Sequence, residues 1–138
     1  MSKERSGARA FIHEHSKAIQ WALVILCALG IFIASSFPAS TLPDAHEHLY
    51  EFAHFCEYWL LATLLVGAFD VPGKRTGYKV AILAILICSL YGLTDEFHQM
   101  FVPGRVPDRT DWIIDTLGGI VGGMAGVWAL TVWRLWHE

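Results

Sequence analysis

The sequence predicts an all-α integral membrane protein, a bundle of four helices with both termini in the cytoplasm. The 138 residues are 54% hydrophobic with a mean hydropathy of +0.43, which is high for a soluble domain. Four apolar runs stand out, and each approaches the roughly 20 residues that cross a hydrocarbon core. The length suits one such domain and is too short for two ordinary ones.

The first apolar run, IQWALVILCALGIFIASSF, predicts a helix over about residues 18–37. It lacks the polar stripe that a helix of a soluble bundle carries. A cleaved signal peptide is the alternative, because SSFPAS lies where cleavage would occur. The apolar core of a signal peptide is only about 7–15 residues long, however. We therefore expect an uncleaved anchor, preceded by a cytoplasmic tail over residues 1–17.

The other three runs predict helices over about residues 48–69, 77–97 and 111–134. The connection DVPGKRTGYK contains proline and glycine, which break helices. All connections are short, so consecutive helices should be neighbours in an up-and-down bundle. The membrane domain is therefore expected over residues 18–134.

Basic residues predict the orientation of the bundle. Eight fall on the side of the two termini and of the connection between the second and third helices: Lys3, Arg5, Arg9, Lys17, Lys74, Arg75, Lys79 and Arg134. Only Arg105 and Arg109 fall on the other side. Because basic loops stay in the cytoplasm, both termini should be cytoplasmic. The net charge of −3, without a basic face, argues against a nucleic-acid partner.

Ionisable residues within the apolar runs gather toward the predicted outer face of the membrane. They come from three helices: His54, Glu57 and Tyr58; Asp95, Glu96, His98 and Gln99; Asp111 and Asp115. A charge at the bilayer centre costs about 2.5–3.5 kcal/mol on insertion scales, so such groups usually face the bundle interior and mark a functional site. Helical spacing places Asp95, His98 and Gln99 on one face and directs Glu96 away from it.

Carboxylates gathered in this way repel one another unless something neutralises them. They could share protons, which would suit acid–base chemistry. They could bind a divalent cation, but no compact motif such as H-x-x-x-H supports one, and no metal ligand is assigned. They could pair with Arg105 or Arg109, and the tight turn Pro103–Gly104–Arg105 would fold Arg105 back onto them. Arginine pairing is the favoured explanation, and no other cofactor is indicated.

Small features have structural interpretations. Gly118, Gly122 and Gly126 share a helix face with Asp111 and Asp115, and this spacing lets helix backbones approach closely. Asp108 or Thr110 is expected to cap the fourth helix. The three cysteines lie inside apolar runs at spacings that match no metal motif, so we expect free, buried thiols.

The polar motifs together resemble the VanZ-like family of small bacterial membrane proteins, over about residues 51–123. The family pattern H-F-x-x-Y is followed by D-E-x-x-Q, by P-G-R and by D-x-x-x-N-x-x-G-x-x-x-G. The matching residues are His54, Phe55, Tyr58, Asp95, Glu96, Gln99, Pro103, Gly104, Arg105, Asp111, Gly118 and Gly122. The chain departs from the pattern at Asp115, where Asn is usual, and at Glu51, where Lys is common. Both departures make the site more acidic.

This resemblance implies a multi-pass protein of the bacterial cytoplasmic membrane. The member that gives the family its name is associated with low-level teicoplanin resistance. A link of this chain to glycopeptide resistance is thus an expectation from the resemblance.

We hypothesise an outward-facing polar pocket that binds or modifies a lipid or a lipid-linked cell-envelope precursor. The catalytic candidates are His54, Asp95, Glu96 and Asp111, and the ligand-binding candidates are Tyr58, Gln99, Arg105 and Asp115. Arg105 would grip a phosphate or carboxylate with two hydrogen bonds. The alternatives are a membrane-embedded hydrolase or transferase that uses these groups, and a structural or shielding protein without catalysis. A proton-coupled transporter is less favoured, since the inner halves of the helices hold no polar relay.

Overall fold

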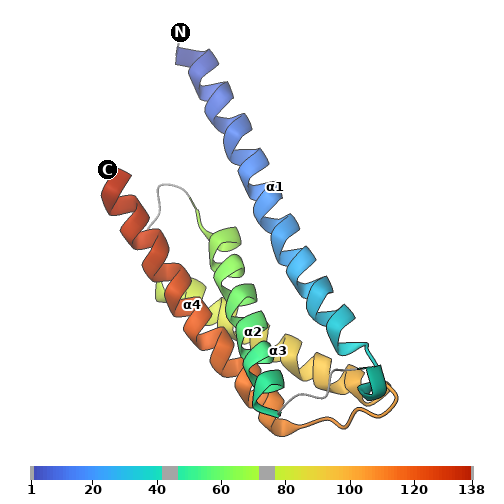
Figure 1. The fold of residues 1–138 in the computed structure, drawn as a ribbon. Helices are drawn as coiled ribbons and strands as arrows, with labels where there is room; N and C mark the ends of the chain where they lie inside the picture. Colours follow the sequence, from blue (N-terminus) through green and yellow to red (C-terminus); the bar gives the residue numbers. More distant parts are fainter. Residues whose placement is uncertain (1, 42–46, 72–76, 138) are drawn as a thin grey trace.

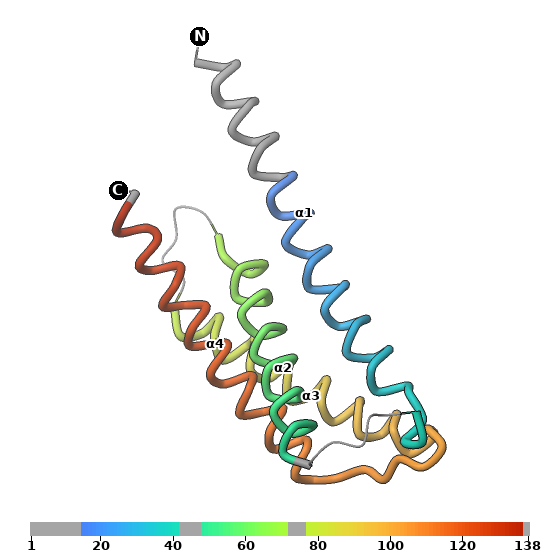
Figure 2. Tube along the Cα trace, in the orientation of Figure 1, coloured from blue at the N-terminus to red at the C-terminus, as the bar shows by residue number. Residues whose placement is uncertain are grey.

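A computed structural model shows four long helices joined by short connections (Figures 1 and 2). It describes residues 2–41, 47–71 and 77–137, and side chains within 15–41, 48–71 and 77–136. The elements are α1 (Ser2–Ser35), the 3₁₀ turn η1 (Ala39–Thr41), α2 (Glu47–Phe69), α3 (Tyr78–Gln99) and α4 (Arg109–His137).

Each of the four helices contains a segment long and apolar enough to cross a membrane. These segments are His15–Ser35, His48–Phe69, Tyr78–Gln99 and Arg109–Trp136. The predicted all-α fold with four membrane-length helices is confirmed. The helix bounds differ from the expectation mainly at α1, which begins at Ser2 rather than near residue 18 and ends at Ser35. The earlier end fits the nearby Pro38, because proline disfavours helical geometry at the residue before it.

The central helix of the bundle is α2, which packs against α1, α3 and α4. In Figure 1, α2 and α4 run side by side, with α3 behind them and α1 along one flank. Over the residues that the structure describes, α1 and α4 do not pack on each other. Most of the core accordingly comes from α2, through Tyr58, Leu61, Ala62, Leu65 and Val66.

Large apolar side chains cover the outside of the bundle. Leu26 of α1, Leu90 of α3 and Met124 of α4 are each at least 63% exposed. A soluble monomer rarely exposes broad apolar patches, because water contact with them is unfavourable. The exposed apolar belt therefore faces lipid, and the polar side chains lie inside.

Glycines of α4 allow its close contact with α2, as predicted. A Cβ atom at Gly122 would lie 2.8 Å from the carbonyl carbon of Trp59, and one at Gly126 would lie 2.9 Å from the Cβ atom of Val66. Thr63 reinforces the contact, because its Oγ1 donates a hydrogen bond to the Gly122 carbonyl at 3.1 Å. The packing role of this glycine stripe is confirmed.

The two ends of the bundle differ in their polar groups. One end carries η1 and residues 100–108, and we call it the site end (Figure 1). At the opposite end, the Lys17 ammonium donates to the carbonyls of Gly67 and Ala68 at 3.1 Å, and Arg134 pairs with Asp70. The Lys17 contacts satisfy carbonyls that the last turn of α2 leaves unpaired.

Candidate functional site

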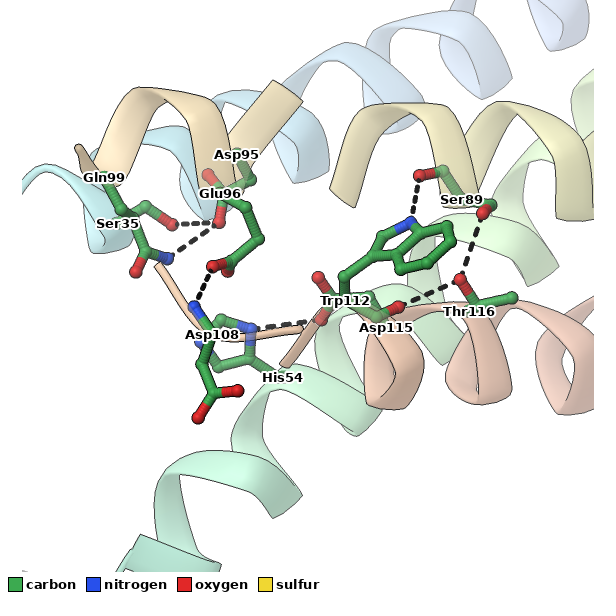
Figure 3. A network of polar contacts seen from close by, with 10 residues as sticks. All are labelled: Ser35, His54, Ser89, Asp95, Glu96, Gln99, Asp108, Trp112, Asp115 and Thr116. Carbon is green, nitrogen blue, oxygen red and sulfur yellow. Dashed lines mark hydrogen bonds and ion pairs between the residues drawn. The ribbon is translucent and has the colours of Figure 1, made fainter. Parts of the chain in front are cut away.

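Polar side chains from all four helices meet at the site end (Figure 3). Asp95 of α3 is 3% exposed and is hydrogen-bonded by two donors at its Oδ2 atom. The Ser35 hydroxyl of α1 donates at 2.7 Å, and the Gln99 amide, one turn along α3, donates at 3.2 Å. Asp95 therefore joins the end of α1 to α3.

A second contact between α1 and α3 lies beside this one. The His98 Nε2 atom is 3.0 Å from the Ser36 hydroxyl, and its ring lies 4.5 Å from that of Phe32. The prediction that Asp95, His98 and Gln99 share a face is confirmed, since Asp95 and His98 contact α1 and Gln99 binds Asp95. Sequence reasoning missed Ser35 and Ser36 as partners, although the run SSFP at the end of an apolar helix was visible.

His54 of α2 and Asp115 of α4 form the other buried pair. The His54 Nδ1 atom lies 3.0 Å from Asp115 Oδ1, and the two side chains are 11% and 0% exposed. A carboxylate beside Nδ1 favours the tautomer that carries its proton there. Nε2 then remains for another partner, and it makes no hydrogen bond to any residue that the structure describes.

The second oxygen of Asp115 has no hydrogen-bond partner although it is buried. It packs against Gly92 of α3, where an added Cβ atom would lie 2.8 Å from Asp115 Oδ2. A side chain at position 92 would thus displace the carboxylate. Sequence reasoning missed Gly92; the available signal was a glycine inside an apolar helix, which usually has a packing or functional reason.

Glu96 points away from the face that carries Asp95, as its helical position predicts. It is nevertheless buried, since only 7% of the residue is exposed. Its Oε2 atom accepts a hydrogen bond from the Asp108 backbone amide at 2.7 Å (Figure 3). Its Oε1 atom is buried without a hydrogen-bond partner. Glu96 therefore holds the connection before α4 against α3 and keeps one acceptor unused.

The connection that carries Arg105 turns tightly, but it does not bring the arginine onto the acids. Gly104 adopts a φ of +76°, which a residue with a side chain rarely adopts, and the Arg105 amide bonds to the Val102 carbonyl at 3.1 Å. No ion pair joins Arg105 to a carboxylate of a described residue. Its Nε atom is buried and lacks a hydrogen-bond partner. The favoured prediction, direct pairing with Arg105 or Arg109, is wrong for the described carboxylates, since neither arginine lies within ion-pair distance of one.

The N-terminus of α4 is built as expected. The Thr110 amide donates to Asp108 Oδ1 at 2.8 Å, so Asp108 is the capping residue. This hydrogen bond holds the pKa of the Asp108 carboxyl below its ordinary value. Farther along, Trp112 donates from Nε1 to the Ser89 carbonyl, and the Thr116 and Ser89 hydroxyls are 3.0 Å apart (Figure 3). These contacts fasten the first turns of α4 to α3.

Tyr58 and Asp111 complete the predicted set. Tyr58 is fully buried, and its hydroxyl has no hydrogen-bond partner. Its ring lies 6.2 Å from that of Tyr91, whose hydroxyl donates to the Ala28 carbonyl of α1 at 2.7 Å. Asp111 is partly exposed in the first turn of α4. The site end thus contains several carboxyl groups and few cationic ones.

A metal ion does not fit the described side chains. No three His, Cys, Asp or Glu side chains among them are arranged to hold one. The three cysteines are free thiols, as predicted, and Cys88 is buried in the core.

A family model described as VanZ/LLP1 matches residues 12–131 of the 138-residue chain. Comparisons with curated proteins and with solved structures found no match. The matched region includes every site residue named above. It also covers three of the membrane-length segments completely and the fourth up to residue 131. The chain is therefore a multi-pass membrane protein that belongs to the VanZ/LLP1 family.

Proposed function

We propose that the chain binds a lipid, or a lipid-linked cell-envelope precursor, at the site end of the bundle. In this proposal both termini lie in the cytoplasm, the membrane is the bacterial cytoplasmic membrane, and the site faces outward. The uneven charge of the connections supports the orientation, because the basic residues gather on the side of the termini. A site of this kind is open to lipids of the outer leaflet.

The observation that carries the proposal is the set of unused polar atoms at the site end. Among the described residues of the site end, four buried atoms have no hydrogen-bond partner: Tyr58 Oη, Glu96 Oε1, Asp115 Oδ2 and Arg105 Nε. One more such atom, Gln20 Oε1 of α1, lies away from this end. Buried polar groups in proteins are paired in about nine cases of ten, so several unpaired atoms in one region call for an explanation. A network that only joined helices would satisfy its own members, as Asp95 does with Ser35 and Gln99.

The unused atoms differ in chemistry, and together they describe the ligand. Arg105 supplies N–H donors and a positive charge, which suit a phosphate or carboxylate. Glu96 and Asp115 supply acceptor atoms, which suit the N–H or O–H groups of a headgroup or sugar. The bundle surface around them is apolar, so the ligand carries hydrocarbon as well. A lipid fulfils all three requirements.

The experiment is a mass-spectrometric analysis of lipids that co-purify with the full chain. We expect one lipid class to be enriched over its share in the membrane, and the Arg105→Gln variant to lose that enrichment. Arg109→Gln is the matched control, since Arg109 is an exposed arginine near the same connection. Equal lipid profiles for the wild type, Arg105→Gln and bulk membrane would refute the proposal.

The His54–Asp115 pair favours a second candidate function, a hydrolase or transferase that acts on the same lipid. A buried carboxylate that orients a histidine through Nδ1 leaves Nε2 to take a proton from water or a hydroxyl. In this mechanism His54 is the general base, Asp115 is the positioning residue and Arg105 holds the phosphate. Asp95 accepts two hydrogen bonds at its Oδ2 atom, from Ser35 and Gln99, so in this proposal it contributes to packing rather than to proton transfer.

Enzymatic activity can be separated from binding with substitutions in this pair. If the chain is an enzyme, membranes that contain the wild type should convert the bound lipid, while His54→Gln and Asp115→Asn should bind it without conversion. If the chain only binds or shields the lipid, no conversion occurs with any variant. Glycopeptide susceptibility of cells that express these variants would show whether a resistance phenotype follows from either activity.

A further inference from the structure

A shallow groove lies beside Glu96 at the site end, with a volume of about 530 Å³. This volume is within the roughly 300–1,000 Å³ of typical ligand sites. Its lining residues are Leu93, Thr94, Glu96, Phe97, Met100 and Pro107. The groove therefore lies between the last two turns of α3 and the connection that leads to α4.

The groove is apolar along its length and has one ionisable residue in its wall. Leu93, Phe97 and Met100 are 52%, 63% and 60% exposed. Leu93 and Phe97 belong to a helix that is long and apolar enough to cross a membrane, and Met100 follows its last residue. Hydrocarbon is the medium in which such a surface is stable. Of the six lining residues, only Glu96 is ionisable, and its Oε1 atom is the buried acceptor that has no partner.

The unused Glu96 oxygen restricts what the groove can hold. A carboxylate oxygen accepts hydrogen bonds and donates none, so its partner must present an N–H or O–H group. The Asp108 amide occupies only Oε2, at 2.7 Å. Three residues before Asp108, the Arg105 guanidinium has an unpartnered Nε atom, which suits an anionic group.

We propose that the groove holds one acyl chain of a phospholipid whose headgroup carries an N–H or O–H donor. The chain lies against Leu93, Phe97 and Met100, the donor reaches Glu96, and the phosphate reaches Arg105. This inference rests on the proposed function and names its ligand class. Ethanolamine and glycerol headgroups have the required donor, and a choline headgroup has none.

The headgroup test uses the purified full chain and native mass spectrometry. Dioleoyl phosphatidylethanolamine, phosphatidylglycerol and phosphatidylcholine are added separately at equal concentrations. We expect the first two to bind at least fivefold tighter than phosphatidylcholine, and either order between them supports the proposal. Equal binding of all three lipids overturns it.

Glu96→Gln tests the role of the unused oxygen. The variant keeps one oxygen for the Asp108 amide but places an NH₂ donor where the unused acceptor stood. We expect the discrimination against phosphatidylcholine to disappear, with circular dichroism showing a folded protein. Discrimination that persists in Glu96→Gln overturns the assignment of Glu96.

The groove itself is tested by a phosphatidylethanolamine with a photoactivatable group in its acyl chain. Cross-links should map to residues 93–107 in the wild type. Leu93→Trp fills the groove and should weaken binding at least tenfold, because each methylene kept out of an apolar site weakens binding by about fourfold. Leu86→Trp is the matched control, since Leu86 lies two turns away on α3, is 55% exposed and does not line the groove.

The outcomes separate this inference from the proposed function. If Leu93→Trp binds like Leu86→Trp and the cross-links map elsewhere, the groove is not the acyl-chain site, although lipid binding at the site end still stands. If the wild type binds none of the three lipids, the inference is refuted, and the proposed function then depends on the co-purification experiment alone.

Discussion

Gly122→Ala is expected to weaken the contact between α2 and α4, where the two helix backbones approach closely. The new Cβ atom would lie 2.8 Å from the carbonyl carbon and 2.9 Å from the Cα atom of Trp59, and it would be closer still to the carbonyl oxygen. Real Cβ atoms essentially never approach other atoms this closely. The obstructing atoms belong to the backbone of a helix and cannot rotate away. The two helices must therefore separate.

Two opposing terms determine the size of the effect. Overpacking a well-packed contact costs about 1–3 kcal/mol. Alanine gains up to about 1 kcal/mol over glycine in a helix interior. Gly30→Ala in α1 isolates the second term, since a Cβ atom at Gly30 would meet no atom within 4 Å. Gly122→Ala should thus be about 1–3 kcal/mol less stable than Gly30→Ala.

The assay is reversible unfolding of both variants in the same detergent, followed by near-ultraviolet circular dichroism. The separation of α2 from α4 should also loosen the 3.0 Å contact between His54 and Asp115, because that pair bridges the same two helices. Lipid binding by Gly122→Ala should therefore fall at temperatures where the protein is still folded. If Gly122→Ala is as stable as Gly30→Ala, the close α2–α4 contact is not present.

Three further predictions concern the site end. Asp108→Ala should destabilise the start of α4 at neutral pH. The cap holds the pKa of Asp108 below its ordinary value, so the stability that Asp108 gives the wild type should be lost as the pH falls through that lowered pKa. The stabilities of the wild type and the variant should therefore converge in acid. Thermal unfolding across pH tests this, and a difference that does not shrink in acid would contradict it. A cysteine at Pro107, in a background without native cysteines, should react with an impermeant thiol reagent from outside the cell, and labelling from the cytoplasm alone would reverse the proposed orientation. Asp95→Leu leaves the Ser35 hydroxyl and the Gln99 amide unpaired, and it should lower the free energy of unfolding by about 2 kcal/mol or more. Denaturant unfolding measures this, and an unchanged midpoint would show that Asp95 does not join α1 to α3.

The helices could be predicted from the sequence because lipid contact imposes long apolar runs. The start of α1 could not, since its first residues, SKERSGARAFIHEHSK, are mostly polar and form no long apolar run. The end of α3 at Gln99 lies two residues beyond the expectation, because the polar residues there bond to one another and to α1 inside the bundle. Apolar patterning thus predicts where a helix crosses the membrane and not where it stops.

Helical spacing also predicted which site residues share a face, but not their partners. Asp95 and His98 were placed together, yet their partners are two serines, a residue type too common to stand out. The turn at Gly104 was predicted as well. The direction of the Arg105 side chain was not, because a turn sets the backbone and leaves a long side chain several rotamers.

The three buried carboxyl groups of the site end differ in how far the protein satisfies them, and this difference assigns their roles. Asp95 accepts two hydrogen bonds at its Oδ2 atom from side chains of α1 and α3, so it already links these two helices. Glu96 and Asp115 each accept one and retain a buried oxygen without a donor. An unpaired buried group costs about 1–3 kcal/mol, and packing alone gives no reason to retain it. Asp115 Oδ2 packs against Gly92, whereas Glu96 lines the groove, so in the proposed lipid complex Glu96 is the carboxyl group that the headgroup reaches first.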